Sequence, residues 1–319
     1  MKILVTGGAG FIGTNLVTHL LALDGEVMVV DDLSTGRAEN IDPRSLFRHM
    51  DICDDDFVQA VVDWQPQVIV HLAAQSSVAR AERKPKLTRR VNVEGTRAVT
   101  RAAIAAGCER VVFASSAAVY GNPARDALPL VETYPASPIN LYGETKLLGE
   151  ELLACELREA EVDYAIARFS NVYGPRQDGG GEGGVVAQFC RALACGQTPV
   201  IYGDGTASRD FVYVGDVVAA LVSMIGGDLW FCERADAPAA GIYNISSGWP
   251  VSVRQLSQAL QRISGQFEDF DLQPARPGDI EHSALSAAKA LASFEWKATV
   301  EMEVGLRKTY DWFVAHTPV

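Results

Sequence analysis

The stretch Thr6-Gly-Gly-Ala-Gly-Phe-Ile-Gly13 decides the fold of this 319-residue chain. It follows a short β-branched run and opens a helical pattern from Phe11 to Leu23. The glycines at positions 7, 10 and 13 have separate uses: the first permits a tight turn, the second lets the backbone approach a pyrophosphate, and the third lets helix and strand pack closely. A strand, turn and helix of this kind predict a dinucleotide site with the anion at the positive helix end.

The second β-branched run ends in Asp31, about twenty residues after the glycine turn. A carboxylate at this place binds the adenosine ribose hydroxyls and repels a 2′-phosphate, which favours NAD over NADP. Asp31 could instead cap a helix, since Asp31, Asp32 and Ser34 all suit turn chemistry. Asp51 and Ile52 follow a further strand, and we expect them near the adenine.

Short β-branched runs alternate with helical patterns over the first two-thirds of the chain. Continuous apolar strands separated by amphipathic helices are typical of a parallel sheet that is covered on both faces. The predicted fold class is therefore α/β, with a doubly wound Rossmann sheet. The expected strands are Ile3 to Thr6, Val27 to Asp31, Val68 to Leu72, Val111 to Ser115, Tyr164 to Phe169 and Gly241 to Ser246.

The pattern changes after Asn171, where a Gly-rich segment leads to a helix near Val185 to Cys195 and to two short strands. We expect a smaller, mixed α/β lobe that binds the substrate. The predicted division gives residues 1–170 with 212–249 to the NAD-binding domain and residues 171–211 with 250–319 to the smaller lobe.

Charge and composition narrow the class of protein. The net charge of −12 argues against nucleic acid and anionic lipid as partners. Ile3 to Leu23 lacks charged side chains, but its glycines and polar residues interrupt the apolar run, so neither a signal peptide nor a membrane span is predicted. Six scattered cysteines without a CxxC pair favour the reducing cytoplasm, and five histidines without ligand spacing predict no metal.

A second helical pattern begins at Tyr142 and carries Lys146 four residues later. Positions four apart share a helix face, so the ammonium can lie close enough to the phenol to lower its pKa toward working pH. The pair follows a strand that ends in Ser115 and Ser116, and such strand ends face the ligand crevice of a doubly wound sheet. We predict that Tyr142 is the base, and that Ser116, or else Ser115, donates to the reacting oxygen.

Together these residues resemble the extended short-chain dehydrogenases/reductases. Within them the chain is similar to the nucleotide-sugar 4-epimerases related to UDP-glucose and UDP-N-acetylglucosamine 4-epimerase, over nearly its whole length. The motifs that carry the resemblance are Thr6-Gly-Gly-Ala-Gly-Phe-Ile-Gly13, Asp31-Asp-Leu-Ser-Thr-Gly36, His71-Leu-Ala-Ala74, Val91-Asn92-Val93, Ser115-Ser-Ala-Ala-Val-Tyr-Gly121, Tyr142-Gly-Glu-Thr-Lys146, Arg168-Phe-Ser-Asn-Val-Tyr-Gly-Pro175, Ser208-Arg-Asp-Phe211 and Arg276-Pro-Gly-Asp279.

The resemblance implies NAD as the cofactor, with Lys146 on the nicotinamide ribose. It also implies that the catalytic residues are Tyr142, Lys146 and Ser116. The residues implied for the cofactor are Gly7, Gly10, Phe11, Ile12, Gly13, Asp31, Asp32, Ser34, Thr35, Gly36, Asp51, Ile52, Leu72, Ala73, Ala74, Gln75, Asn92, Ser115, Tyr142, Lys146 and Phe169.

A UDP-sugar is the implied substrate, with Asn171, Arg209 and Arg276 at its diphosphate, Tyr202 on the uracil and Asp279 on the nucleotide ribose. A planar guanidinium suits a diphosphate edge, because it can donate two parallel hydrogen bonds. Either arginine could instead be an ordinary surface residue, and Arg209 could pair with its neighbour Asp210. The implied substrate residues are Ser76, Ser116, Asn171, Val185, Val186, Val200, Tyr202, Arg209, Arg276, Asp279 and Ser283.

The reaction is indicated by Ala117 and Ala118. Sugar dehydratases of the family carry Asp-Glu at these two positions, and UDP-glucuronate decarboxylases carry Glu at the second. Without such an acid, the remaining chemistry is hydride transfer from C4 to NAD and back, which is epimerisation through a 4-keto sugar. The alternatives are a 4-epimerase of another nucleotide sugar such as UDP-glucuronate, a dehydratase or decarboxylase, and a non-catalytic NAD-binding regulator.

Ser283 stands where the family places a residue against the 2-substituent of the sugar. A serine there leaves room for an N-acetyl group, which favours UDP-GlcNAc and UDP-GalNAc, with UDP-glucose and UDP-galactose as further candidates. Ser283 could equally cap a helix from Ala284 to Leu291. The resemblance also implies a homodimer paired through the helices nearest Leu87 to Ala106 and Tyr142 to Glu159.

Overall fold

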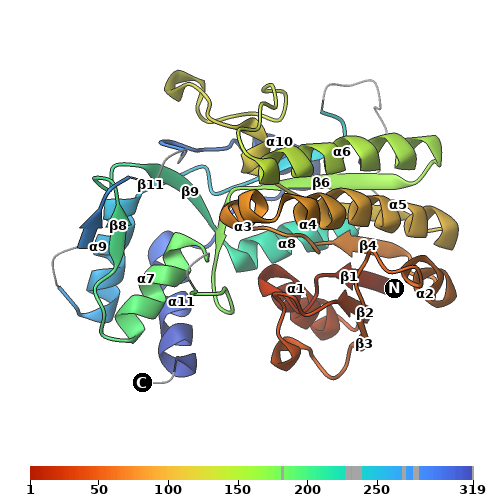
Figure 1. Cartoon of the computed structure of the whole chain (residues 1–319), viewed down its shortest axis with the longest axis horizontal. Helices are drawn as coiled ribbons and strands as arrows, with labels where there is room; N and C mark the ends of the chain where they lie inside the picture. Colours follow the sequence, from red (N-terminus) through yellow and green to blue (C-terminus); the bar gives the residue numbers. More distant parts are fainter. Residues whose placement is uncertain (181–182, 227–230, 232–238, 268–270, 276–279, 318–319) are drawn as a thin grey trace.

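A central sheet of seven parallel strands forms the larger part of the molecule, in the order β10-β6-β5-β4-β1-β2-β3 (Figure 1). The computed structural model describes the chain apart from residues 181–182, 227–230, 232–238, 268–270, 276–279 and 318–319. The doubly wound sheet is confirmed, and each predicted strand is present with no end shifted by more than one residue. The strands are β1 (Lys2–Thr6), β2 (Glu26–Asp31), β3 (Leu46–His49), β4 (Val68–His71), β5 (Arg110–Ser116), β6 (Asp163–Phe169) and β10 (Ile242–Ile245).

Helices cover both faces of this sheet (Figure 1). Side chains alternate along each strand, so that Ile3 and Val5 pack into one core and Leu4 into the other. The first core lies under α1 (Phe11–Ala22), α8 (Val214–Ile225) and α10 (Ala288–Phe294). The second lies under α2 (Phe57–Trp64), α5 (Gly95–Ala106) and α6 (Leu141–Glu159). Burial on both faces explains why the strands are continuously apolar.

The connection from β4 to β5 is built from several short helices. It contains α3 (Val78–Arg83) and α4 (Pro85–Arg89), and a π-helical turn, Arg90–Glu94, that continues into α5. Ser77 caps α3 by accepting a hydrogen bond from the backbone N–H of Arg80. This segment runs beside the carboxyl end of β4, where a pocket is expected.

The smaller lobe holds two short sheets. Strands β7 (Asn171–Tyr173), β9 (Ser208–Tyr213) and β11 (Pro250–Ser252) form one of them, and β8 (Val200–Tyr202) with β12 (Asp271–Gln273) forms the other. Three helices pack on a separate apolar core: α7 (Val185–Ala194), α9 (Val253–Ser264) and α11 (Met302–His316). The smaller mixed lobe predicted from the sequence is therefore present.

The domain boundaries, 1–170 with 212–249 and 171–211 with 250–319, remain a proposal. Within the range proposed for the smaller lobe, α10 packs against β10, and Ala290 and Trp296 belong to a core of the large sheet. Among the described residues, no helix combines the length and the apolar character needed to cross a membrane.

The alternative role considered for Ser283, as the cap of a helix, is wrong. The sequence suggested a helix from Ala284 to Leu291 with Ser283 as its cap, but α10 begins four residues later, at Ala288. Residues before it are extended, since the N–H of Ser283 donates to Ser208 O and Leu285 forms a bridge with Leu130. Backbone pairing to two other segments thus overrides the local helical preference of this stretch.

Asp216 in α8 fastens the segment that leads into α11. Its carboxylate is buried and accepts hydrogen bonds from Thr299 N, Thr299 Oγ1 and Val300 N, at 3.0 to 3.1 Å. Its backbone carbonyl accepts a further bond from Trp296 Nε1. Removing the carboxylate would leave buried donors without partners.

We therefore expect Asp216→Ala to lower the free energy of unfolding by about 3 kcal/mol, measured by urea unfolding. Glu303→Ala, on the exposed face of α11, is the matched control and should change it by less than about 0.5 kcal/mol. Equal losses in the two variants would contradict this reading of Asp216.

Candidate active site

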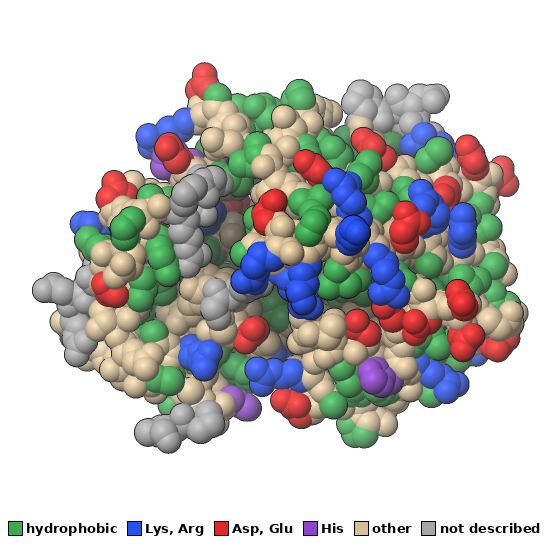
Figure 2. Space-filling view, in the orientation of Figure 1, with side chains coloured by type: hydrophobic (Ala, Val, Ile, Leu, Met, Phe, Trp, Pro, Cys, Tyr) green, Lys and Arg blue, Asp and Glu red, His purple; other side chains and the backbone are tan. Residues whose placement is uncertain are grey.

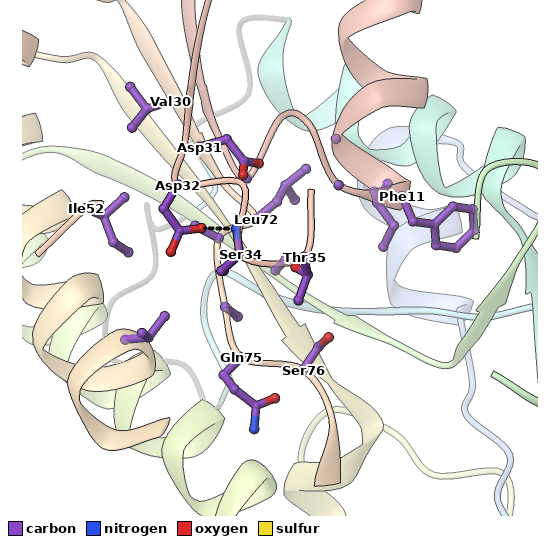
Figure 3. A pocket seen from close by; sticks show the side chains of 18 of the residues that line it. Phe11, Val30, Asp31, Asp32, Ser34, Thr35, Ile52, Leu72, Gln75 and Ser76 are labelled. Carbon is purple, nitrogen blue, oxygen red and sulfur yellow. Dashed lines mark hydrogen bonds between the residues drawn. The ribbon is translucent and has the colours of Figure 1, made fainter. Parts of the chain in front are cut away.

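A pocket of about 280 Å³, partly open to solvent, lies at the carboxyl ends of β1, β2, β4 and β5. This is the place where the strand order reverses, at which doubly wound sheets bind ligands. Figure 3 shows Asp31 at the end of β2 and Asp32 directly after it, with Gln75 and Ser76 from the segment after β4. The predicted residues that line the pocket are Gly7, Gly10, Phe11, Ile12, Gly13, Asp31, Asp32, Ser34, Thr35, Asp51, Ile52, Leu72, Ala73, Ala74, Gln75, Ser76, Ser115, Tyr142, Lys146 and Phe169.

The glycine turn makes room for a dinucleotide. Gly7 has a φ of +72°, which favours glycine, and a Cβ on Gly13 would lie 2.2 Å from Gly7 O. Gly10 is the N-cap of α1 and offers no side-chain cap, so the first N–H groups of the helix are free to meet an anion. The turn therefore fits a pyrophosphate at the helix end.

Asp31 is placed as the sequence predicted for a ribose-binding carboxylate. It is buried at the end of β2 and accepts hydrogen bonds from Ala9 N at 3.0 Å and Leu33 N at 2.9 Å. Burial raises its pKa above the usual 3.8, although these two bonds lower it in part. The helix-cap alternative is wrong, because the next helical turn, Ala38–Asn40, has Arg37 at its N-cap.

Two residues predicted for the cofactor do not line the pocket. Asn92 is buried behind it and holds the segment after β4: it accepts a bond from Gln75 N at 2.8 Å and donates to Gln75 O at 3.0 Å. Gly36 packs against Asp31, since a Cβ at this position would lie 2.7 Å from Asp31 Oδ1. Both support residues that do line the pocket.

The predicted catalytic residues lie together where α6 meets β5. Asn140 caps α6 by accepting a bond from Gly143 N at 2.9 Å, which places half-buried Tyr142 in the first turn of the helix. Ser116 hydrogen-bonds to the phenol of Tyr142. Lys146 is buried one turn further on, and its Nζ donates to Ala114 O at 2.7 Å.

The electrostatics of this cluster differ from the sequence prediction. Burial raises the pKa of the Tyr142 phenol, and the hydroxyl of Ser116, rather than the Lys146 ammonium, is the group that lowers it in this arrangement. Burial lowers the pKa of Lys146 to about 8, while Glu150 raises it. The Lys146 ammonium does not lower the pKa of Tyr142 here because it is directed to the strand, where it donates a hydrogen bond to Ala114 O.

Most residues predicted for the substrate belong to the smaller lobe. Asn171 is exposed on β7, Tyr202 is 39% exposed at the end of β8, and Arg209 Nη1 donates to Ser208 O and Glu281 O. Val186 is buried in the lobe core, so only its backbone can meet a ligand. Arg276 and Asp279 lie outside the described residues. Of the described residues predicted for the substrate, Ser76 is the one that lines the pocket. The described ones that do not line it are Ser116, Asn171, Val185, Val186, Val200, Tyr202, Arg209 and Ser283.

Several lining residues were not predicted. Val30, Met50 and Ala114 directly precede predicted residues at strand ends, so their position in the sequence could have shown them. Arg80 and Leu87 come from α3 and α4, where the sequence gave no such signal, whereas Val91 of the π-helical turn directly precedes Asn92, which the resemblance had implied for the cofactor. The full set of unpredicted lining residues is Val30, Met50, Arg80, Leu87, Val91 and Ala114.

A cationic rim borders the pocket. Figure 2 shows Lys and Arg side chains gathered over α3 and α4, beside the hollow between the lobes. The stretch from Arg80 to Arg90 carries six cationic residues and a single acidic one, Glu82, within a chain whose net charge is −12. Arg80 belongs to the lining itself. This local field favours anionic ligands despite the overall charge.

The sheet, the glycine turn, the carboxylate at Asp31 and the cluster of Tyr142, Lys146 and Ser116 together define an NAD-dependent enzyme of the extended short-chain dehydrogenase/reductase type. The family model described as the NAD dependent epimerase/dehydratase family matches residues 3–245, and the chain belongs to this family. NAD as the cofactor and the resemblance to nucleotide-sugar 4-epimerases are thereby confirmed.

Three known proteins show how close the similarity is. The chain is 40% identical to UDP-glucose 4-epimerase of Mycolicibacterium smegmatis, over 98% of each chain. Its structure is similar to that of UDP-glucose 4-epimerase from Thermotoga maritima with UDP-glucose, with a TM-score of 0.91, 37% identity and 98% of each chain covered. It is also similar to UDP-N-acetylglucosamine 4-epimerase from Methanobrevibacter ruminantium M1 in complex with UDP-N-acetylmuramic acid, with a TM-score of 0.91, 30% identity and 99% of each chain covered.

We expect Asp31→Asn to weaken NAD binding by about 10- to 100-fold, because a charged acceptor for the ribose hydroxyls is lost. The preference for NAD over NADP should fall as well, since the repulsion of a 2′-phosphate is removed. Titration calorimetry with each dinucleotide on cofactor-free protein measures both effects. Asp24→Asn, an exposed position after α1, should bind as the wild type does; an unchanged NAD affinity in Asp31→Asn would contradict the role of Asp31.

Proposed function

We propose that this protein interconverts the C4 epimers of a UDP-sugar through a transient 4-keto intermediate. The observation that carries the proposal is the cluster at the end of β5, where Ser116 meets the Tyr142 phenol and Lys146 lies buried one helical turn away. A phenol and a hydroxyl at one place can take a proton from a sugar hydroxyl and hold the oxygen that becomes a ketone.

The proton and hydride steps divide between protein and cofactor. Tyr142, in its phenolate form, takes the proton of the 4-hydroxyl, and Ser116 donates a hydrogen bond to the oxygen as the C4 carbon is oxidised. The positive nicotinamide ring of bound NAD would favour the phenolate. Bound NAD supplies the acceptor for the C4 hydride and returns it to the same carbon. The 4-keto sugar rotates between the two hydride transfers, and Tyr142 then gives its proton back. Because the hydride returns to the sugar, the reaction has no net redox change.

The local sequence after Ser116 supports epimerisation over loss of water or carbon dioxide. Ala117 and Ala118 open a short 3-10 helix, Ala117–Tyr120, next to the Ser116 hydroxyl, which accepts a bond from Ala118 N at 3.1 Å. Both side chains are methyl groups, so neither can act as the acid that elimination requires.

We propose UDP-glucose and UDP-N-acetylglucosamine, with their galacto epimers, as the substrates, leaning toward the N-acetyl sugars. Ser283 supports the acceptance of an N-acetyl group because its side chain is small. The relatives named above include epimerases of both kinds. The cationic rim over α3 and α4 suits the diphosphate that these sugars share.

A homodimer is our proposal for the assembly. Helices α5 and α6 lie side by side on one face of the sheet, and Arg97 Nε of α5 approaches Glu156 Oε1 of α6 at 3.7 Å. Each helix also carries an exposed apolar side chain: Ile104 is 37% exposed and Leu148 is 41% exposed. Apolar side chains on two adjacent helices suit a four-helix interface with a second copy.

We also propose that the protein acts in the cytoplasm. The described cysteines, at positions 53, 108, 155, 190 and 195, are all free thiols. Free thiols persist in a reducing compartment, whereas extracellular proteins commonly join theirs in disulfides.

The test of the activity is to incubate the purified protein separately with UDP-glucose, UDP-N-acetylglucosamine and UDP-glucuronate, and to identify the products by NMR. We expect galacto-configured products from the first two. Tyr142→Phe should lower kcat by at least about 100-fold while NAD stays bound, because the proton acceptor is lost. A 4-keto-6-deoxy or pentose product, or no product with added NAD, would overturn the proposal.

The second test concerns the sugar. Ser283→Tyr should lower kcat/KM for UDP-N-acetylglucosamine by about 10-fold or more and leave UDP-glucose nearly unchanged, because a large ring would crowd the N-acetyl group. Ser264→Tyr, at the end of α9, is the control for a new tyrosine elsewhere in the lobe. Equal losses of kcat/KM for both sugars would show that Ser283 does not set the preference between them.

A further inference from the structure

A buried ion pair lies directly behind the cluster of Tyr142, Lys146 and Ser116. Arg168 of β6 and Glu150 of α6 meet through two nitrogens: Arg168 Nη2 is 2.6 Å from Glu150 Oε2, and Nε is 3.0 Å from Oε1. Their side chains are only 5% and 3% exposed. Charges taken so far out of water are costly unless they are paired and hydrogen-bonded, so the geometry of this pair is closely fixed.

Ser115 completes a triangle with the pair. Ser115 of β5 and Arg168 of β6 are register partners in the sheet, and the Ser115 hydroxyl donates to Glu150 Oε1. The guanidinium also lies 4.8 Å from the centre of the Tyr120 ring, and its Nη1 donates to Glu132 O. Glu150 is thus held by both β5 and β6. Its partner on β5, Ser115, is the residue next to Ser116.

Lys146 and Glu150 are four residues apart and lie on the same face of α6. Both reach the same strand end, since Lys146 donates to Ala114 O while Glu150 accepts from Ser115, the following residue. The helix is therefore fastened to β5 by two opposite charges, one turn apart.

The surroundings of Lys146 contain little other charge. From β4, His71 is buried between Thr6 Oγ1 and Thr96 Oγ1, and burial together with Lys146 lowers its pKa to about 3, so the ring is neutral at working pH. From β5, the Phe113 ring lies 4.9 Å from Nζ. Tyr142 is the titratable neighbour on α6 itself, and the Arg168 cation stands behind Glu150. Among the described charged groups around Lys146, Glu150 is the one that raises its pKa.

We infer that Glu150, clamped by Arg168 and Ser115, is a positioning residue: it fastens α6 to the end of β5 and places a negative charge one helical turn from Lys146. Glu150 touches neither substrate nor cofactor and acts through Lys146. The inference rests on the proposed function for its effect on turnover, whereas its effect on Lys146 can be measured without turnover.

The test uses Glu150→Gln and the double variant Glu150→Gln/Arg168→Met. The first removes the charge and keeps the shape, and the second removes both charges, which avoids an unpaired buried cation. Because Glu150 raises the pKa of Lys146, its loss lets the ammonium give up its proton at lower pH. We expect the alkaline limb of the kcat profile to move down by about one pH unit in both variants.

The protonation of Lys146 can also be measured directly. Lys146 lines the pocket, so labelling by a small amine reagent such as cyanate, quantified by mass spectrometry across the pH range, reports its protonation. The half-maximal pH of labelling should fall by the same amount in both variants. This measurement does not depend on which sugar is the substrate.

The chain offers a matched control on the same two strands. Arg110 and Asp163 are register partners at the opposite end of β5 and β6, and Arg110 Nε lies 2.6 Å from Asp163 Oδ2, with side chains 10% and 0% exposed. We expect Arg110→Met/Asp163→Asn to alter the free energy of unfolding but to leave the pH profile and the labelling of Lys146 unchanged.

The outcomes separate the two proposals. A wild-type protein without 4-epimerase activity overturns the proposed function, while the labelling of Lys146 still decides the inference. A wild-type pH profile and wild-type labelling in folded Glu150→Gln or in the double variant would overturn the inference, because the Arg168–Glu150 pair would then only stabilise the fold. If neither variant folds, or if the control pair shifts the labelling equally, the inference is overturned as well.

Discussion

The reversal of strand order between β1 and β4 is the constraint on which the rest of the structure depends. From β1 the chain passes through α1 on one face of the sheet, and from β4 it passes to α5 on the other. Because these connections leave in opposite directions, the carboxyl ends of the two strands are left uncovered. The pocket forms there, and the glycine turn after β1, Asp31 of β2 and Ser115 of β5 all reach it.

The chemistry of the pocket depends on burying groups that water would otherwise stabilise. Burial raises the pKa of Tyr142 and lowers the pKa of Lys146, so each is moved away from its charged form. Two neighbouring groups oppose these shifts: Ser116 lowers the pKa of the Tyr142 phenol, and Glu150 raises the pKa of the Lys146 ammonium. A few fixed dipoles and charges therefore decide which protonation states are populated, because the low-dielectric surroundings leave little screening.

The smaller lobe is joined to the sheet through backbone pairing and a buried carboxylate. Asp210 of β9 is fully buried and accepts bonds from Ser247 and Gly248 after β10 and from Leu285 N. Ser283 belongs to the same extended segment, through its bond to Ser208 O. The position proposed to meet the sugar is therefore set by contacts that also link β9 and β10, so the two sides of the hollow are structurally coupled.

The sequence by itself determined the fold class, the cofactor and most of the pocket lining, because those features are local: glycines at fixed spacing, a carboxylate at a strand end, and a lysine one helical turn after a tyrosine. Tertiary structure alone decided what is not local. It placed Arg80 and Leu87 in the lining, kept residues 283 to 286 extended where local preference suggested a helix, and directed Lys146 to the strand. The pairing of Arg168 with Glu150 arises in the same way, because only the register of β5 with β6 under α6 brings these distant residues together.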